Sequence, residues 1–120
     1  MPQALALVDD IFFQARILET ARQLGVEMRA CSTAEALLAA VAVSAPRLVV
    51  VDLNARGNPI GAIEQMQSQA PQIPLIAFLS HVQTELAERA RLAGCRAVMP
   101  RSQFTRNLAT ILGQAKSESA

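Results

Sequence analysis

Short apolar runs alternate with helix-like segments five times along the chain. Runs rich in Ala, Val, Ile and Leu predict buried strands at residues 4–8, 26–30, 48–51, 75–79 and 97–99. Apolar side chains recur at helical spacing after each run, and this alternation predicts an α/β fold of the (βα)5 type. We expect a doubly wound five-stranded parallel sheet with helices on both faces. The run at 48–51 is the most hydrophobic, so it is placed centrally.

Local signals place the ends of the helices. Gly25 is expected to end the first helix, and the capping-box pattern from Ser32 to Glu35 is expected to begin the second. From about Ala115 onward the sequence predicts a frayed polar tail. Later helices are predicted at residues 60–69 and 84–93, and along the apolar stripe of Phe104, Leu108, Ile111 and Leu112.

The bulk composition narrows the class of protein. Residues 1–120 fit a single domain, and 52% of them are hydrophobic, which is enough for a core. No apolar run approaches the roughly 18 residues that span a bilayer, so no membrane segment is expected. A net charge of +1, scattered basic residues and the absence of Tyr and Trp argue against nucleic-acid binding. The distant Cys31 and Cys95 suggest reduced thiols in the cytoplasm.

Three aspartates stand at the ends of two predicted strands. Asp9 and Asp10 follow the first strand, and Asp52 ends the third. In the common strand order 2-1-3-4-5 these two strands are neighbours, and ligands bind at the carboxyl ends of parallel strands. Carboxylates that converge repel one another unless a cation lies among them. The sequence therefore predicts an acidic pocket suited to Mg²⁺.

The chain lacks the residues that nucleotide binding and hydrolysis require. No glycine-rich turn follows the first strand and no phosphate-binding loop is present, which excludes the common nucleotide folds. The single histidine, His81, has no Gly-x-Ser-x-Gly motif to serve. It is interpreted as a surface residue at a helix entry or, in a second interpretation, as a rim residue of the acidic pocket. A Mg²⁺-dependent hydrolase would need a general acid that the chain does not offer, so no enzyme is expected.

Four short motifs, in order, resemble those of the receiver domains of two-component response regulators. The resemblance covers residues 4 to about 112 and implies a flavodoxin-like fold and a role in phosphorelay signalling. The motifs are Val8-Asp9-Asp10, Val50-Val51-Asp52-Leu53-Asn54, Pro74-Leu75-Ile76 and Ala93-Gly94-Cys95.

The resemblance also implies roles for individual residues. Asp9 and Asp10 match the acidic pair that helps hold Mg²⁺, and Asp52 matches the phospho-accepting aspartate, which is also a metal ligand. The backbone carbonyl of Asn54 matches a further ligand. Mg²⁺ suits such oxygen ligands and neutralises charge on a transferring phosphoryl group.

The chain departs from the family at its signal-reading positions. Arg101 stands where the family has a lysine, and its planar guanidinium could pair bidentately with Asp52. In the family, a Ser or Thr hydroxyl at the end of the fourth strand takes part in the switch. Counting back from Gly94 places Leu79 at this position, whereas a shift by one residue places Ser80 there. Val98 stands at the position where the family has the aromatic residue of the switch. These departures suggest an atypical receiver or a pseudo-receiver.

The main hypothesis is a stand-alone, receiver-like signalling domain that acts through contacts with a protein partner, such as a sensor kinase or a downstream effector. Phosphorylation of Asp52 with Mg²⁺ is part of that hypothesis. The alternative is a phosphorylation-independent interaction module in which Asp52 pairs with Arg101. Homodimerisation through the last helices is left open.

Overall fold

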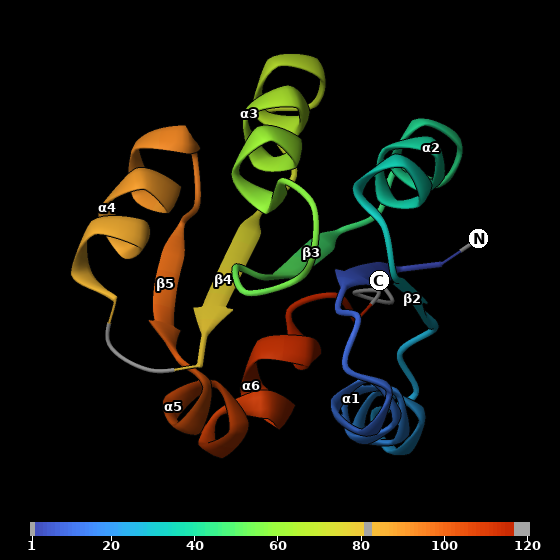
Figure 1. The fold of residues 1–120 in the computed structure, drawn as a ribbon. Helices are drawn as coiled ribbons and strands as arrows, with labels where there is room; N and C mark the ends of the chain where they lie inside the picture. The colour runs from blue at the N-terminus through green and yellow to red at the C-terminus, as the bar shows by residue number, and fades with distance from the viewer. Residues whose placement is uncertain (1, 81–82, 117–120) are drawn as a thin grey trace.

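A computed structural model describes residues 2–80 and 83–116, and His81 lies outside this part of the chain (Figure 1). In it, a five-stranded parallel sheet has the order β2-β1-β3-β4-β5, which confirms the predicted doubly wound topology and the central place of β3. The strands are β1 (Ala4–Leu7), β2 (Met28–Cys31), β3 (Leu48–Asp52), β4 (Leu75–Leu79) and β5 (Ala97–Pro100).

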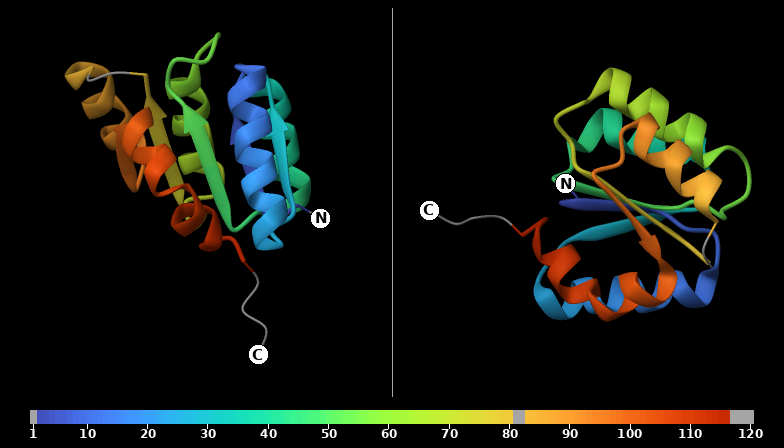
Figure 2. Two further views of the ribbon diagram at one scale, coloured as in Figure 1. Left: turned by 90° about the horizontal axis from the view of Figure 1, so that it is seen from below. Right: turned by 90° about the vertical axis from the view of Figure 1, so that its left-hand side faces the viewer.

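Helices cover both faces of the sheet. Helices α1, α5 and α6 lie on one face, and α2, α3 and α4 lie on the other, as the two views of Figure 2 show. None of the helices in the described ranges is both long and apolar enough to cross a membrane. Their bounds are α1 (Ile11–Leu24), α2 (Ala34–Ser44), α3 (Pro59–Gln69), α4 (Thr84–Ala93), α5 (Arg101–Arg106) and α6 (Leu108–Gly113).

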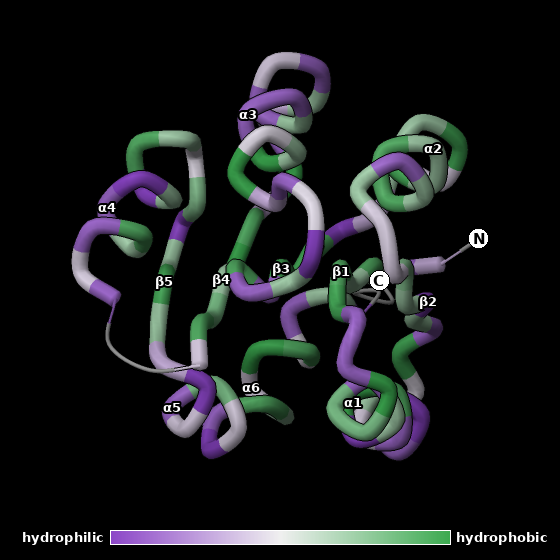
Figure 3. The backbone as a smooth tube through the Cα atoms, in the orientation of Figure 1, coloured by the Kyte–Doolittle hydropathy of each residue, from purple (hydrophilic) through white to green (hydrophobic). Residues whose placement is uncertain are grey.

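The core consists of two apolar layers, one on each side of the sheet. Every residue of β1, β3 and β4 is buried, as expected for parallel strands covered on both faces. In Figure 3 the hydrophobic colour follows β4 through the middle of the molecule. The layer under α2, α3 and α4 is aliphatic, whereas the layer under α1, α5 and α6 contains three packed phenyl rings, those of Phe13, Phe78 and Phe104.

The helix ends agree with the sequence in one case and differ in another. Gly25 ends α1 in a left-handed conformation with φ of 75°, which glycine adopts without a steric penalty. The N-cap of α2 is Thr33 rather than the predicted Ser32, because the Thr33 hydroxyl accepts a hydrogen bond from the Ala36 N–H at 3.1 Å. The Ser32 hydroxyl instead accepts a hydrogen bond from Gln14.

The last helical segment differs from the single helix that its apolar stripe predicts. It divides into α5 and α6 at Asn107, whose side-chain amide donates a hydrogen bond to the Gln103 carbonyl at 3.0 Å. Phe104, Leu108, Ile111 and Leu112 are nevertheless all buried, so the stripe correctly identifies the core side. Ala115 is also fully buried, and the packed chain therefore extends beyond the predicted start of the tail.

Candidate functional site

The carboxyl ends of β1 and β3 bring the three predicted aspartates to one edge of the sheet. β1 and β3 are hydrogen-bonded neighbours, with Leu7 in register with Val51. Asp9 and Asp10 occupy the connection from β1 to α1, and Asp52 is the last residue of β3. The strand order therefore places these acids at the same edge of the sheet, as the sequence pattern predicts.

Arg101 lies across this edge and contacts two of the acids. It is the first residue of α5, directly after β5. Its Nη1 lies 3.3 Å from Asp10 Oδ2, and its Nη2 lies 3.3 Å from Asp52 Oδ2. The predicted bidentate pair with Asp52 is therefore wrong in detail, because the guanidinium divides its two nitrogens between two carboxylates.

The same guanidinium also lies over two aromatic rings. The Arg101 Cζ lies 4.4 Å from the ring centroid of Phe13 and 5.6 Å from that of Phe78. The Phe78 ring in turn stacks on Phe104, with the centroids 4.4 Å apart. A guanidinium on a phenyl face is attracted by the negative ring quadrupole and gives up little hydration. Arg101 thus contacts two rings and two carboxylates, while its buried Nε has no hydrogen-bond partner among the described residues.

Asp52 is the most deeply placed of the three acids, with 2% of its surface exposed. Burial raises its pKa, and the negative charges of Asp9 and Asp10 act in the same direction. The Asn54 N–H, which donates to Asp52 Oδ1 at 2.9 Å, and the charge of Arg101 oppose this rise without cancelling it. The ionised form of Asp52 is therefore costly despite the adjacent cation.

The pKa of Asp10 is shifted in the opposite direction. This residue is the N-cap of α1 and accepts hydrogen bonds from the N–H groups of Phe12 and Phe13 at 3.0 and 3.1 Å. The bond from the Phe13 N–H is the main cause of its lowered pKa. Desolvation opposes it, and Arg101 and the Phe12 N–H lower the pKa further. Asp10 therefore carries a stable negative charge at the mouth of the site.

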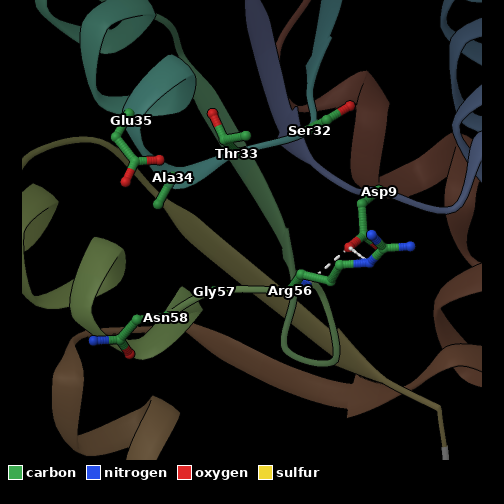
Figure 4. A pocket seen from close by; sticks show the side chains of 8 residues that line it. All are labelled: Asp9, Ser32, Thr33, Ala34, Glu35, Arg56, Gly57 and Asn58. Carbon is green, nitrogen blue, oxygen red and sulfur yellow. Dashed lines mark hydrogen bonds and ion pairs between the residues drawn. The ribbon is translucent and has the colours of Figure 1, made fainter.

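Asp9 belongs to a neighbouring pocket of about 480 Å³ between the starts of α2 and α3. Figure 4 shows its carboxylate turned toward Arg56, whose backbone N–H donates to Asp9 Oδ2 at 2.8 Å. The Arg56 Nε lies 3.8 Å from the same oxygen, and the Arg56 side chain is 96% exposed. Two arginines thus share the three acids, one partly buried against aromatic rings and one in solvent.

The site fits Mg²⁺ by the chemistry of its donors rather than by their arrangement. Carboxylate and backbone carbonyl oxygens, the set that Asp9, Asp10, Asp52 and Asn54 offer, are the ligands that Mg²⁺ prefers. Within residues 2–80 and 83–116, however, no three acidic, histidine or cysteine side chains are gathered as a metal site. Arg101 contacts one oxygen each of Asp10 and Asp52, so a metal ion would compete with it for these atoms.

Asn54 makes contacts that the sequence did not suggest. Its side-chain oxygen accepts a hydrogen bond from the Ser80 N–H at 2.7 Å, and its amide nitrogen donates to Gln83 Oε1 at 2.9 Å. Nothing in the residue pattern pairs positions 54 and 83, because both lie in loops without periodicity. The predicted role of Asn54 concerned only its backbone carbonyl.

The two candidates for the switch hydroxyl position differ in burial. Leu79 ends β4 and is buried, whereas Ser80 follows it and is exposed. Val98, at the position of the family's aromatic residue, is partly buried against the aliphatic layer. Phe13 is a further residue whose role was missed, since its helical spacing predicted a core position but not a platform for Arg101.

The comparisons with known proteins identify the fold. No protein-family model and no curated protein sequence matches the chain. Among solved structures, the receiver domain of NtrX from Brucella abortus is similar at a TM-score of 0.82 and 23% identity, over 97% of this chain and 99% of that one. The chain has the fold of a response regulator receiver domain.

Two more structures support the same assignment. The receiver domain of the Francisella response regulator 1452 is similar at a TM-score of 0.78 and 14% identity, over 97% of this chain and 100% of that one. A longer NtrX chain from Brucella abortus, in complex with ADP, matches at a TM-score of 0.81 and 22% identity over 93% of this chain. This chain spans 25% of that longer one. Structural similarity at identities this low establishes the receiver fold alone. Any activity has to be argued from the residues of the site.

Proposed function

We propose that this chain is a receiver-like signalling domain that acts through contacts with other proteins, and that Arg101 serves as the resident cation of its acidic pocket. The observation that carries the proposal is the position of the guanidinium, 3.3 Å from both Asp10 and Asp52. The partner is proposed to be a protein such as a sensor kinase or a downstream effector. A cytoplasmic location is part of the proposal and is supported by the two free, buried cysteines.

The chemistry of arginine supports a pocket that keeps its charge balance without a bound ion. A guanidinium stays protonated at every accessible pH, so it neutralises neighbouring carboxylates permanently. Contact with Phe13 and Phe78 adds to the hold on Arg101. In this state the acceptor oxygen Asp52 Oδ2 is engaged, and the domain would present one constant surface to its partner.

Phosphorylation of Asp52 is the second candidate function, and the donor set favours it. Asp9, Asp10, Asp52 and the backbone carbonyl of Asn54 would hold Mg²⁺, which supplies neutralisation of phosphoryl charge. Asp52 would attack the phosphorus through a carboxylate oxygen, forming an acyl phosphate as the bond to the leaving group breaks. Arg101 would first have to release Asp52 Oδ2.

Intact mass after incubation with a small-molecule phosphodonor and Mg²⁺ separates the two functions. The wild type, Arg101→Lys and Asp52→Asn are compared, and circular dichroism checks that each is folded. Lysine keeps the charge but loses the fork and much of the aromatic stacking, so Arg101→Lys should free the acceptor. We expect one added phosphoryl group in Arg101→Lys, little in the wild type and none in Asp52→Asn.

One result would contradict the role of Arg101 as the resident cation. If the wild type gains one phosphoryl group as completely as Arg101→Lys, and Asp52→Asn gains none, Arg101 does not block the acceptor. The second candidate function would then replace the first.

A further inference from the structure

A small groove lies between α4 and β5, on the side of the sheet away from Arg101. Its volume is about 160 Å³, and its walls include the apolar side chains of Leu79, Val98 and Pro100. Gln83, at the N-terminal end of α4, also lines it. Figure 1 shows α4 and β5 side by side, and they make direct contacts along the groove.

One side of this groove is connected to Asp52 by hydrogen bonds through a single residue. The Asn54 N–H donates to Asp52 Oδ1 at 2.9 Å, and the Asn54 side-chain amide donates to Gln83 Oε1 at 2.9 Å. Gln83 occupies the N-cap position of α4, yet its side chain makes no capping hydrogen bond. The Gln83 side-chain oxygen therefore accepts a hydrogen bond from Asn54 and does not cap the helix.

The other side of the groove is connected to the same acid through the chain itself. Pro100 lines the groove and is in register with Leu79 on β4. The next residue is Arg101, whose Nη2 lies 3.3 Å from Asp52 Oδ2. Each carboxylate oxygen of Asp52 is thus linked to a different wall of the groove, one by Asn54 and one by Arg101.

We infer that Asn54 is a positioning residue that couples the state of Asp52 to the α4 wall of the groove. The inference rests on the proposed function, since it takes the Asp52 pocket to be the site where the signal originates. A change at Asp52 moves the Asn54 loop, and the Asn54–Gln83 bond carries the movement to the start of α4.

Amide NMR spectra of the isotopically labelled full chain test the coupling without any partner or phosphodonor. The perturbation is Asp52→Asn, which removes the charge that binds Arg101. We expect it to shift the amide signals of Thr84 and Ala87, on the α4 wall, as well as those near Arg101. In an Asn54→Ala background the shifts at Thr84 and Ala87 should be lost, while those near Arg101 remain.

A matched pair of variants at Gln83 separates coupling from a general structural effect. Gln83→Met has a similar length but no acceptor, so it should abolish the response of Thr84 and Ala87 to Asp52→Asn. Gln83→Glu retains an acceptor for the Asn54 amide and should preserve the response. Each comparison is made within one background, so shifts caused by the Gln83 change itself cancel.

Two outcomes would overturn the inference. Equal responses of Thr84 and Ala87 in the wild-type background and in the Gln83→Met or Asn54→Ala background would show that the signal bypasses the Asn54–Gln83 hydrogen bond. No response even in the wild-type background would show that Asp52 and the groove are not coupled. Neither outcome depends on the phosphodonor measurement, so a failure of the proposed function is recognised separately, by the intact masses of the wild type and Arg101→Lys.

Discussion

The inner and outer halves of the acidic pocket share one arginine, but their carboxylates have pKa values shifted in opposite directions. Asp52, in the inner half, and Asp10, in the outer half, each contact one nitrogen of Arg101 at 3.3 Å. The pKa of Asp52 is nevertheless raised, mainly by burial, while that of Asp10 is lowered, mainly by the Phe13 N–H. Depth and backbone donors, rather than the shared cation, decide which acid carries the charge.

The second arginine extends the contrast. Arg56 is almost completely exposed and reaches Asp9 at 3.8 Å, whereas the Arg101 side chain is 30% exposed and rests on aromatic rings. Water and salt screen the first pair, and its flexible side chain loses entropy on pairing. Only the inner cation is therefore expected to affect stability and reactivity.

Removing the aromatic platform should have the largest effect. Phe13→Ala deletes a buried ring that contacts Arg101, Phe78 and Phe104, and it should lower the free energy of unfolding by about 3–5 kcal/mol. Phe12→Ala, at the adjacent position with 84% of the residue exposed, is the control and should change it by no more than about 0.5 kcal/mol. Urea unfolding of both variants measures the difference, and equal losses would contradict the proposed platform.

Removing the inner cation should come next. Arg101→Met leaves the buried Asp52 without its neighbouring charge and should cost roughly 1–3 kcal/mol in metal-free buffer. Added Mg²⁺ should restore more stability to this variant than to the wild type, because the competing guanidinium is gone. Arg101→Lys, which keeps the charge, is the control. Thermal unfolding with and without Mg²⁺ measures both effects, and an unchanged midpoint in Arg101→Met would argue against Arg101 as the resident cation.

The two carboxylates should give pH dependences of opposite sign. Because the folded pKa of Asp52 is raised, its contribution to stability is largest in acid and is lost as pH rises from about 4 through the folded pKa. Asp52→Asn should therefore gain stability relative to the wild type over that rise. The folded pKa of Asp10 is lowered, so its contribution is present above about pH 4 and is lost as pH falls through the folded value.

Unfolding free energies of the wild type, Asp52→Asn and Asp10→Asn across this pH range measure the two dependences. Slopes of the same sign for both variants would show that the shared arginine, rather than depth, controls these acids.

The smallest effect is expected at the outer arginine. Arg56→Gln should change the free energy of unfolding by no more than about 0.5 kcal/mol, and moderate salt should remove even that difference. Chemical unfolding at two salt concentrations checks this. A loss as large as that of Arg101→Met would mean that exposure does not separate the two halves of the pocket.

Much of this architecture can be predicted from the sequence because it follows from periodicity. The apolar runs gave the strands, and the strand order placed Asp9, Asp10 and Asp52 at one edge of the sheet. The division of Arg101 between two acids did not follow, since side-chain geometry depends on the Phe13 ring beneath it. Such contacts join residues distant in sequence, and no local pattern records them.

Local competition explains the remaining differences. Ser32 and Thr33 are both good N-caps, and the choice between them depends on Gln14, which donates a hydrogen bond to the Ser32 hydroxyl. Asn107 was missed as the division between two helices because asparagine is tolerated inside a helix until its side chain competes for a backbone carbonyl. Ala115 has a polar sequence neighbourhood but a buried side chain, which periodicity over so few residues cannot reveal.

The position of each strand in the sheet also determines the order in which parts of the domain should open. β3 is paired on both sides and fully buried, whereas β5 pairs only with β4 and is partly exposed throughout. Hydrogen exchange is expected to be slowest at β3 and faster at the edge strand. The strand that carries Asp52 would thus persist while the β5 wall of the groove opens, and Arg101, which directly follows β5, would move with that wall.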